Sequence, residues 1–279
     1  MNDTPAKPAD TLPPEERPAV ERYLRSLYTG VFSEEAIDTH VEAHVGFAFA
    51  NYAVEVVSLT QPAGARVVDI GSGFGSFVLA ARSAGYDALG IEIAPFEVDF
   101  ARRRLTRLRP GDRPEAVYRL GDSAGLDMPE GSVDAVTFWN VLEHVDRYEP
   151  ILAAAHRMLK PGGCLYVICP NYLAWRQEAH YHVPWTPWLT LAGRRHASAY
   201  LRRLGKNPGY LDSSIFFRTN WGVQRTFRRL GMDLYDLTNQ RRMSPSASML
   251  RFALRQPREA VRFHSPFRAA VELAARKRG

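Results

Sequence analysis

The sequence predicts an α/β protein built on a doubly wound, mostly parallel sheet. Segments typical of strands and of helices alternate from Arg66 to Cys169, and the strand-like segments are continuous apolar runs. Such runs are expected where helices cover both faces of a parallel sheet. Clusters of Gly and Pro separate the segments, as they do at turns.

Residues 1–60 are predicted to hold an N-terminal arm followed by helices. The first dozen residues are rich in Pro, Asp and Thr, which is typical of a segment without regular structure. A helix is expected over about residues 14–28. Ile37, Val41 and Val45 then begin a second helical pattern, which ends before Pro62.

Residues 61–170 are predicted to form the core of the fold. Its segments are strands at 66–70, 88–93, 116–120, 133–139 and 164–169, and helices at 74–84, 95–108 and 148–159. The remaining parts are an aromatic-rich insertion at 171–219, the end of the core at 220–240 with a helix at 221–230 and a strand at 232–237, and a basic helical C-terminus at 241–279.

The composition is that of a globular protein, since 46% of the 279 residues are hydrophobic and 24% are charged. No apolar run is long enough for a transmembrane segment and the N-terminus lacks a signal-peptide core, so a cytoplasmic location is expected. The net charge of +6 is uneven: residues 1–170 hold 16 Lys and Arg against 24 Asp and Glu, and residues 171–279 hold 20 against 6. The basic part permits an acidic acceptor, a nucleic acid, peripheral contact with an anionic membrane, or only a solvated surface.

The sharpest local pattern is Val67-Val-Asp-Ile-Gly-Ser-Gly-Phe-Gly75, a strand that enters a glycine-rich turn before a helix. Glycines let the backbone approach a ligand, and a helix N-terminus offers free N–H groups. A dinucleotide loop would have Gly or Ala where Ser76 stands, and Asp69, two residues before the first glycine, would repel a pyrophosphate. The loop therefore predicts a ligand with a cationic amino group rather than NAD.

Carboxylates also follow the next two predicted strands. Glu92, at the end of the second strand, can accept hydrogen bonds from both hydroxyls of an unphosphorylated ribose. Asp122 follows the third strand, where a carboxylate can accept from an adenine amino group. Because the carboxyl ends of parallel strands meet at one crevice, these positions with Asp69 predict a nucleoside that carries an ammonium group.

With these motifs the chain resembles the class I S-adenosylmethionine-dependent methyltransferases of the type-11-like group. The matching stretches are VVDIGSGFGSF, GIEI, GDSAGLDMPEGSVDAVTFWNVLEHV and LKPGGCLYVICPN. The resemblance implies S-adenosylmethionine as methyl donor, and it implies roles for eight residues: Asp69, Gly71 and Gly73 at the methionine end, Glu92 at the ribose, Ile93 at the adenine face, Asp122 and Ser123 at the adenine edge, and Asn140 at the sulfonium.

Glu143 and His144 follow the fourth strand, beside the expected position of the methyl group. Methyl transfer to a hydroxyl needs the oxygen in line and its proton removed, and imidazole is partly unprotonated near neutral pH. His144, with Glu143 beside it, is therefore the predicted general base. In relatives that methylate quinone precursors, a further Glu stands where this chain has Asn140 and the set resembles a metal site. No metal ligand is predicted here, with a divalent ion left as an alternative.

The insertion is predicted to bind the acceptor through Tyr172, His180, Tyr181, His182 and Trp185. Aromatic ring faces cover the C–H surfaces of sugars, and polar tips meet their hydroxyls. The segment also resembles the tails of methyltransferases of bacterial polysaccharide and glycoside biosynthesis. This resemblance implies O-methylation of a sugar hydroxyl in an oligosaccharide, polysaccharide precursor or glycoside.

Other functions stay open on sequence alone. A lipid-linked, aromatic or amine acceptor is the nearest alternative, and a non-catalytic RNA- or partner-binding module is a remote one. The expected partner is a small-molecule or oligosaccharide acceptor rather than a nucleic acid. A homodimer is compatible with the sequence.

Overall fold

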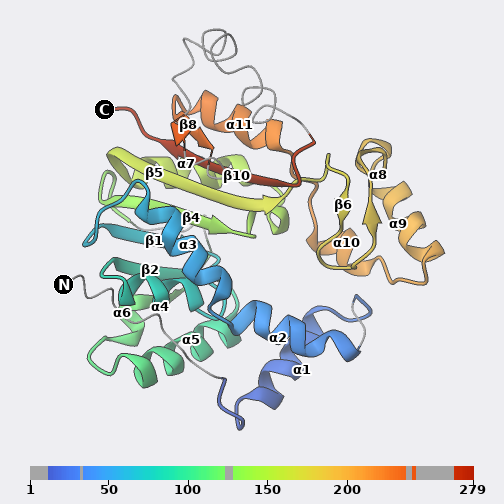
Figure 1. The fold of residues 1–279 in the computed structure, drawn as a ribbon, viewed down its shortest axis with the longest axis horizontal. Helices are drawn as coiled ribbons and strands as arrows, with labels where there is room; N and C mark the ends of the chain where they lie inside the picture. Colours follow the sequence, from blue (N-terminus) through green and yellow to red (C-terminus); the bar gives the residue numbers. More distant parts are fainter. Residues whose placement is uncertain (1–11, 32–33, 123–127, 237–240, 243–266) are drawn as a thin grey trace.

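The computed structural model describes residues 12–31, 34–122, 128–236, 241–242 and 267–279. An eight-stranded sheet forms its centre, with the strand order β3-β2-β1-β4-β5-β10-β8-β9 (Figure 1). The strands are β1 (Arg66–Ile70), β2 (Asp87–Glu92), β3 (Tyr118–Leu120), β4 (Val133–Trp139), β5 (Leu159–Pro170), β8 (Asp233–Asp236), β9 (Arg241–Arg242) and β10 (Ala270–Arg276).

The five strands from β3 to β5 pair in parallel, whereas β10 is antiparallel to both β5 and β8. Helices cover both faces, so the predicted doubly wound, mostly parallel fold is confirmed. One face carries α3 (Ala48–Ser58), α4 (Ser76–Ser83) and α5 (Pro95–Leu108), and the other carries α7 (Tyr148–Met158) and α11 (Asn220–Arg229). The short helix α6 (Pro114–Val117) precedes β3.

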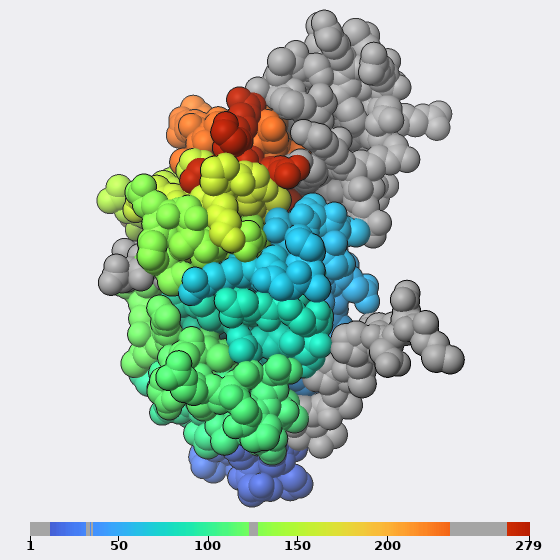
Figure 2. Space-filling model, turned by 90° about the vertical axis from the view of Figure 1, so that its left-hand side faces the viewer, coloured from blue at the N-terminus to red at the C-terminus, as the bar shows by residue number. Residues whose placement is uncertain are grey.

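The helical pattern that begins at Ile37 divides into two helices, α2 (Ile37–Val45) and α3. Gly46 separates them, because its extended backbone ends α2 and a Cβ there would lie 2.4 Å from the carbonyl oxygen of Glu42. Figure 2 shows the light-blue residues of α3 beside those of α4, and the two helices share one hydrophobic cluster under the sheet. The break therefore lets α3 pack on the core while α2 points away from it.

The other helices gather beyond the carboxyl ends of the parallel strands (Figure 1). We call this assembly the cap; it consists of residues 12–31 and 34–45 and the insertion 171–219. Its elements are α1 (Arg17–Leu27), η1 (Glu34–Ala36), α2, β6 (Arg176–Gln177), β7 (Pro184–Trp185), α8 (Pro187–Ala192), α9 (Arg194–Arg203) and α10 (Gly209–Ser214).

A third hydrophobic cluster holds the cap together. Val20 and Leu24 of α1, both fully buried, belong to the same cluster as Trp185 and Leu201 of the insertion and Phe74 of the glycine loop. Two segments separated by the whole core thus bury their apolar side chains against each other. Since burying apolar surface is the main favourable term in folding, neither segment forms its part of the cap alone.

The C-terminal prediction is wrong over the residues of β10. A helix is expected there because Ala-Val-Glu-Leu-Ala-Ala-Arg is rich in strong helix formers. In the structure this segment pairs with β5 on one side and β8 on the other, and Val271, Leu273 and Ala275 are buried. Pairing in the middle of the sheet overrides local propensity. The rest of the predicted helical C-terminus, from 243 to 266, and the N-terminal arm over 1–11 lie outside the described residues.

Within the described ranges, every helix is too short or too polar to cross a bilayer.

Candidate active site

The glycine-rich loop joins β1 to α4 through three residues with left-handed backbone. Gly71, Gly73 and Gly75 have φ angles of 72°, 53° and 82°, a region that favours glycine. The backbone N–H groups of Gly71 and Ser72 donate to the carbonyl of Ile91, at 2.8 and 3.2 Å, which ties the loop to the end of β2. The loop is therefore fixed against the sheet before any ligand arrives.

The three glycines differ in the room that a side chain would have at each position. A Cβ at Gly71 would lie 2.5 Å from Cγ2 of Val141, and one at Gly75 would lie 2.6 Å from the hydroxyl of Tyr118, so both glycines are needed for packing. Among the described residues, a Cβ at Gly73 would approach only Oε2 of Glu97, at 3.3 Å. Gly73 is thus the loop position that is kept open for something other than the protein core.

Two of the predicted cofactor carboxylates have different surroundings. Asp69 is buried inside the sheet and accepts a hydrogen bond from the hydroxyl of Thr137 at 2.6 Å; burial raises its pKa to about 8. Glu92 accepts from the backbone N–H groups of Gly73, Ile93 and Ala94, at 3.0, 2.7 and 2.9 Å. Glu92 is therefore held rigidly at the loop, whereas Asp69 lies beneath it.

A third carboxylate at this site, Glu97, is one that sequence reasoning missed. It lies in the first turn of α5 and accepts a hydrogen bond from the hydroxyl of Tyr23, at 2.9 Å, on helix α1 of the cap. Burial and the nearby charge of Glu92 raise the pKa of Glu97 to about 7. Tyr23 also stacks on Phe96, with ring centroids 4.4 Å apart. The only signal in the sequence was an acidic residue five positions after Glu92.

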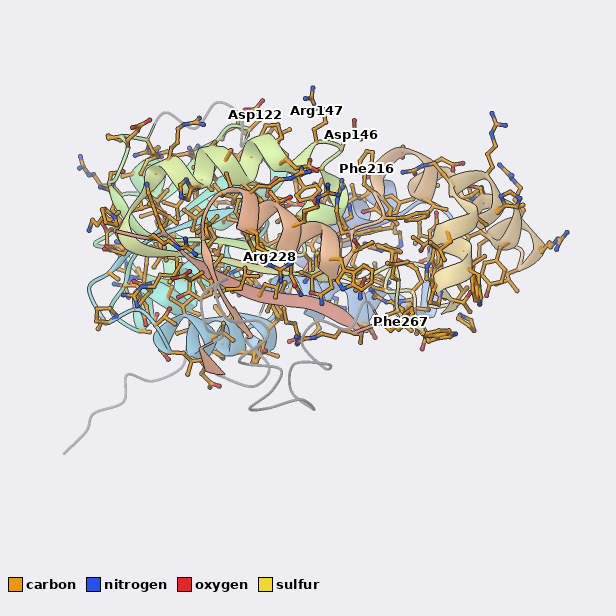
Figure 3. All side chains as sticks on the ribbon, turned by 90° about the horizontal axis from the view of Figure 1, so that it is seen from above. Asp122, Asp146, Arg147, Phe216, Arg228 and Phe267 are labelled. Carbon is orange, nitrogen blue, oxygen red and sulfur yellow. The ribbon has the colours of Figure 1, made fainter. Side chains whose placement is uncertain are left out.

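The predicted adenine and sulfonium contacts lie at the same edge of the sheet. Ile93 is 70% exposed beside Glu92, which suits an apolar side chain that covers an aromatic base. Asp122 is exposed after β3, at the outer edge of the molecule in Figure 3. Asn140, just after β4, has a φ of 54° and donates its backbone N–H to Ile168 at 2.7 Å. Ser123 lies outside the described residues.

These residues fit the predicted cofactor by the chemistry of their donors and acceptors. The loop carries carboxylates from three positions and an open glycine, and the hydroxyl of Ser72 is buried without a hydrogen-bond partner in the described part of the chain. S-adenosylmethionine carries an ammonium and a sulfonium, so an acidic cradle attracts it. The contacts assigned to Asp69, Glu92, Ile93, Asp122 and Asn140 stay predictions.

Glu143 and His144 form the short helix η2 (Leu142–His144) after β4. Nδ1 of His144 donates to the carbonyl of Ser214 at 2.8 Å, which leaves Nε2 as the acceptor nitrogen. Burial lowers the pKa of His144 to about 4. Glu143 is 1% exposed, its Oε2 has no hydrogen-bond partner among the described residues, and burial raises its pKa to about 7.

The insertion brings His180 against His144, with ring centroids 5.3 Å apart. Nδ1 of His180 lies 2.9 Å from Oε1 of Glu178, a fully buried carboxylate. Glu178 also accepts from the Tyr172 hydroxyl at 3.0 Å and from the backbone N–H of Tyr181 at 2.7 Å. Burial alone would raise the pKa of Glu178, but these hydrogen bonds and His180 lower it to about 2. Sequence reasoning singled out His180 but missed Glu178.

A chain of phenols and imidazoles continues from His180 into the N-terminal helices. Tyr210 lies 5.5 Å from His180 and 5.0 Å from Tyr28 between ring centroids, and its hydroxyl bonds to that of Tyr28. The hydroxyl of Tyr28 lies 2.9 Å from Nε2 of His44, whose Nδ1 donates to the carbonyl of His40 at 2.7 Å. We call Tyr28, His44, His144, His180 and Tyr210 the polar aromatic cluster.

Three of the five predicted acceptor-binding residues are placed inside the insertion rather than on an accessible surface. Tyr172 and Tyr181 are fully buried and Trp185 is 1% exposed, and each is committed within the fold: Tyr172 to Glu178, the Tyr181 hydroxyl to the N–H of Leu211, and the Trp185 indole to Thr190. Their role as acceptor contacts is therefore not supported, because their rings pack the cap. His182 is exposed, with a φ of 53°, and keeps its predicted role as a proposal.

The described residues contain no group of three or more His, Cys, Asp or Glu side chains arranged to hold a metal ion. Histidines are close together in the polar aromatic cluster, but Nδ1 of each is engaged with a carbonyl or a carboxylate, and Nε2 of His44 lies against a phenol.

Comparison with known proteins agrees with this arrangement. Residues 68–167 match the profile of a family described as a methyltransferase domain. This part of the chain has the class I methyltransferase fold. The predicted cofactor, S-adenosylmethionine, is confirmed at the level of this domain family.

Two solved structures share the fold over most of the chain. A SAM-dependent methyltransferase of Thermotoga maritima, titled a possible histamine N-methyltransferase, superposes with a TM-score of 0.51 over 92% of this chain and 98% of its own, at 17% identity. The YcgJ protein of Bacillus subtilis gives 0.52 over 83% of this chain and 99% of its own, at 16% identity. At this identity the likeness shows the fold only.

The curated relatives match less than half of the chain. The ubiquinone biosynthesis O-methyltransferase of Xanthomonas axonopodis pv. citri is 38% identical over 112 residues, 40% of this chain and 45% of that protein. The 2-methyl-6-phytyl-1,4-hydroquinone methyltransferase of Synechocystis is 32% identical over 130 residues, 46% of this chain and 38% of that protein. The chain thus spans less than half the length of these relatives. Neither is named for a sugar acceptor, so the predicted resemblance to polysaccharide methyltransferases is not shown.

Proposed function

We propose that the chain is an S-adenosylmethionine-dependent O-methyltransferase that acts on a hydroxyl of a small-molecule acceptor. The observation that carries the proposal is the meeting of the glycine loop with the polar aromatic cluster. Phe74 of the loop lies 6.1 Å from the ring of His44, and His144 follows the strand next to β1. A cofactor held by the loop would therefore present its methyl group toward imidazole and phenol side chains.

The residues around the loop would hold the cofactor by complementary charge and shape. Glu92 would accept from the ribose hydroxyls, Ile93 would cover the adenine, and the open side of Gly73 would admit the methionine end. When bound, S-adenosylmethionine supplies a methyl group on a positively charged sulfur, which leaves as a neutral thioether. The protein's own task is to orient the acceptor oxygen in line with that methyl group and to remove its proton.

A phenolic hydroxyl is the acceptor that we propose first. One relative reported above is named for ubiquinone biosynthesis and the other for a hydroquinone, and a flat phenol suits a site that brings Tyr28, Tyr210 and imidazole rings together. The sugar hydroxyl predicted from the sequence is the second candidate, but it loses the stacking surface of Tyr172, Tyr181 and Trp185, which are buried. Lipid-linked and amine acceptors remain alternatives to both.

The experiment measures transfer of labelled methyl from S-adenosylmethionine to a panel of phenols, mono- and oligosaccharides and nucleotide sugars. Binding of S-adenosylmethionine is measured in parallel by calorimetry. Label in catechols or related phenols supports the first candidate, and label in sugars supports the second. A folded protein that binds no S-adenosylmethionine and labels no acceptor contradicts the proposed function, and binding without any transfer favours a non-catalytic module.

A further inference from the structure

The insertion supplies a histidine paired with a buried carboxylate, beside the predicted base. We propose that His180, oriented by Glu178, is the group that takes the proton from the acceptor hydroxyl. The proposal rests on the O-methyltransferase function and moves the role of base from His144 to His180. It makes the insertion part of the catalytic machinery, and not only a cover over the acceptor.

The geometry of the pair fixes the tautomer of His180. A carboxylate only accepts hydrogen bonds, so the 2.9 Å contact between Oε1 of Glu178 and Nδ1 of His180 places the proton on Nδ1. The lone pair is then on Nε2, for which the described residues provide no hydrogen-bond partner. An oriented imidazole with a free Nε2 is the arrangement that a general base requires.

Glu178 is built to stay charged in a buried position. Its side chain is fully buried, which is costly for a carboxylate without partners. Four groups compensate: the Tyr172 hydroxyl, the backbone N–H groups of His180 and Tyr181, and the His180 ring. The result is a fixed negative charge directly behind the imidazole, which stabilises the imidazolium formed when His180 accepts a proton.

Among the described residues, no carboxylate lies at hydrogen-bond distance from the ring of His144. Its Nδ1 donates to the carbonyl of Ser214, a neutral acceptor that orients the ring but offsets little positive charge. Burial, the largest cause, and His180 nearby lower the pKa of His144 to about 4. His144 is therefore neutral and well placed to accept a hydrogen bond, but protonating it costs more than protonating an imidazole that is backed by a carboxylate.

The groups that face His180 come from four parts of the chain. They are Glu178 on its own segment, Glu143 and His144 after β4, Tyr28, His40 and His44 of the N-terminal helices, and Tyr210 of α10. Among these described groups, the side chain of Glu178 is the one that lies at hydrogen-bond distance from the ring. The others set the polarity of the space in which an acceptor hydroxyl would reach Nε2.

The proton step is balanced within these groups. As the acceptor O–H bond breaks, its electron pair stays on oxygen and serves the new O–C bond, while the proton moves to Nε2 of His180. The product is an imidazolium facing the Glu178 carboxylate. Loss of that proton to water after product release restores the starting state, so no other reactant is needed.

The first test follows a bound phenol without turnover. 4-Nitrocatechol changes its visible absorption when it loses a proton, and it is titrated into protein saturated with S-adenosylhomocysteine. We expect the wild-type protein and the His144→Ala variant to bind it as the phenolate at a pH where the free probe is mostly neutral. His180→Ala should bind it in the neutral form. His196→Ala, an exposed histidine of the same insertion, is the matched control and should behave as the wild-type protein does.

The second test uses labelled methyl transfer to 3,4-dihydroxybenzoate. His180→Ala should lower kcat by about 100- to 10,000-fold, the usual contribution of a positioned base, with the Kd of S-adenosylmethionine changed less than about threefold. Glu178→Gln removes the counter-charge from a positioning residue. It should lower kcat by about tenfold or more and move the acid limb of the pH–rate profile to lower pH, which a purely structural defect would not do.

The outcomes separate this proposal from the proposed function. A protein that binds no S-adenosylmethionine and transfers no methyl group contradicts the function itself. A wild-type protein that transfers methyl, beside a His180→Ala variant that keeps kcat within about threefold or still binds the phenolate, overturns the assignment of His180. Loss of the phenolate in His144→Ala alone returns the role of base to His144. A wild-type protein that binds the probe only in its neutral form also overturns the proposal.

Discussion

Most of the predicted cofactor side of the site comes from one continuous stretch, from Asp69 to Glu97, whereas the proposed acceptor side is assembled from distant segments. Tyr28 and His44 come from the N-terminal helices, His144 from the end of β4, and His180 and Tyr210 from the insertion. The glycine loop lies within residues 68–167, which match a methyltransferase domain, and it is a local motif. The proposed acceptor site depends on how two separate segments pack together.

The largest effect should follow from closing the cofactor loop. Gly73→Val places a branched side chain on the open side of the loop and strains a left-handed backbone, so binding of S-adenosylmethionine should weaken by more than about 100-fold, as measured by calorimetry. Gly64→Val is the control, because Gly64 also has positive φ but its Cβ would meet nothing within 4 Å. If Gly73→Val is folded and binds normally, the loop does not hold the cofactor.

The next largest effect should follow from a substitution in the core of the cap. It should lower the local stability of the acceptor side more than that of the cofactor side. Leu24→Ala removes a fully buried side chain from the cluster that joins α1 to the insertion, at a cost of about 2–5 kcal/mol. Amide hydrogen exchange should accelerate across residues 178–215, while the Kd of S-adenosylmethionine changes only a few fold. Leu27→Ala, on the exposed side of the same helix, should change little. Equal acceleration in β1 and β2 would show that the two sides are one cooperative unit.

Glu92 tests the charge on the cofactor side. Glu92→Ala removes the predicted acceptor for both ribose hydroxyls, and about 2–4 kcal/mol of binding free energy should be lost, which is a Kd raised about 30- to 1,000-fold. The control is Asp87→Ala at the other end of the same strand, where the carboxylate is exposed and lies away from the loop. Unchanged cofactor binding by the folded Glu92→Ala variant would refute the ribose contact.

The smallest expected effect is the change in S-adenosylmethionine affinity with pH. Burial and Glu92 raise the pKa of Glu97 to about 7, so Glu97 is largely protonated at pH 6 and largely charged at pH 8. A cationic cofactor gains from the charged form, so binding should tighten by up to about tenfold between pH 6 and pH 8. Burial raises the pKa of Asp69 to about 8, so Asp69 contributes to the same trend, and Tyr23 is hydrogen-bonded to Glu97 throughout.

Glu97→Gln should remove the part of this pH dependence that belongs to Glu97. Asp99→Asn, an exposed carboxylate on the same helix, is the control and should leave the pH dependence as it is in the wild-type protein. The measurement is calorimetric titration with S-adenosylmethionine at both pH values. A dependence of equal size in Glu97→Gln would assign the titration to another group.

Sequence patterns predict the residues of the cofactor side because the position of each one depends on the residues next to it in the sequence. Gly73 lies between two other glycines in a strand–turn–helix pattern, and Glu92 ends a strand, so their position at the crevice follows from local order. The acceptor side offered no such pattern: Glu178 is one acidic residue in an aromatic stretch, and Tyr28 ends a helix far from the insertion. Their neighbours are set by burial of Leu24 and Trp185 in one cluster, which single-sequence periodicity does not report.

The same limit of single-sequence patterns explains why the sequence predicts an acceptor-binding role for Tyr172, Tyr181 and Trp185, which are buried in the structure. Aromatic residues in a loop indicate either a binding surface or the core of a small subdomain, and composition does not distinguish the two. In this chain the three rings are buried in the cap, and the histidine and carboxylate between them, His180 and Glu178, are the groups to which we assign the chemistry.

The position of β10 has a consequence for how the chain folds as it leaves the ribosome. β10 is the last strand in sequence order, yet it lies between β5 and β8 in the sheet. Until it is synthesised, the parallel part of the sheet ends at β5 with an open edge of unpaired backbone groups, a template for pairing with other chains. The glycine loop, β1 to β5 and the whole insertion emerge before that edge is closed. Nascent chains stalled before Ala270 should therefore depend on chaperones far more than the finished protein does.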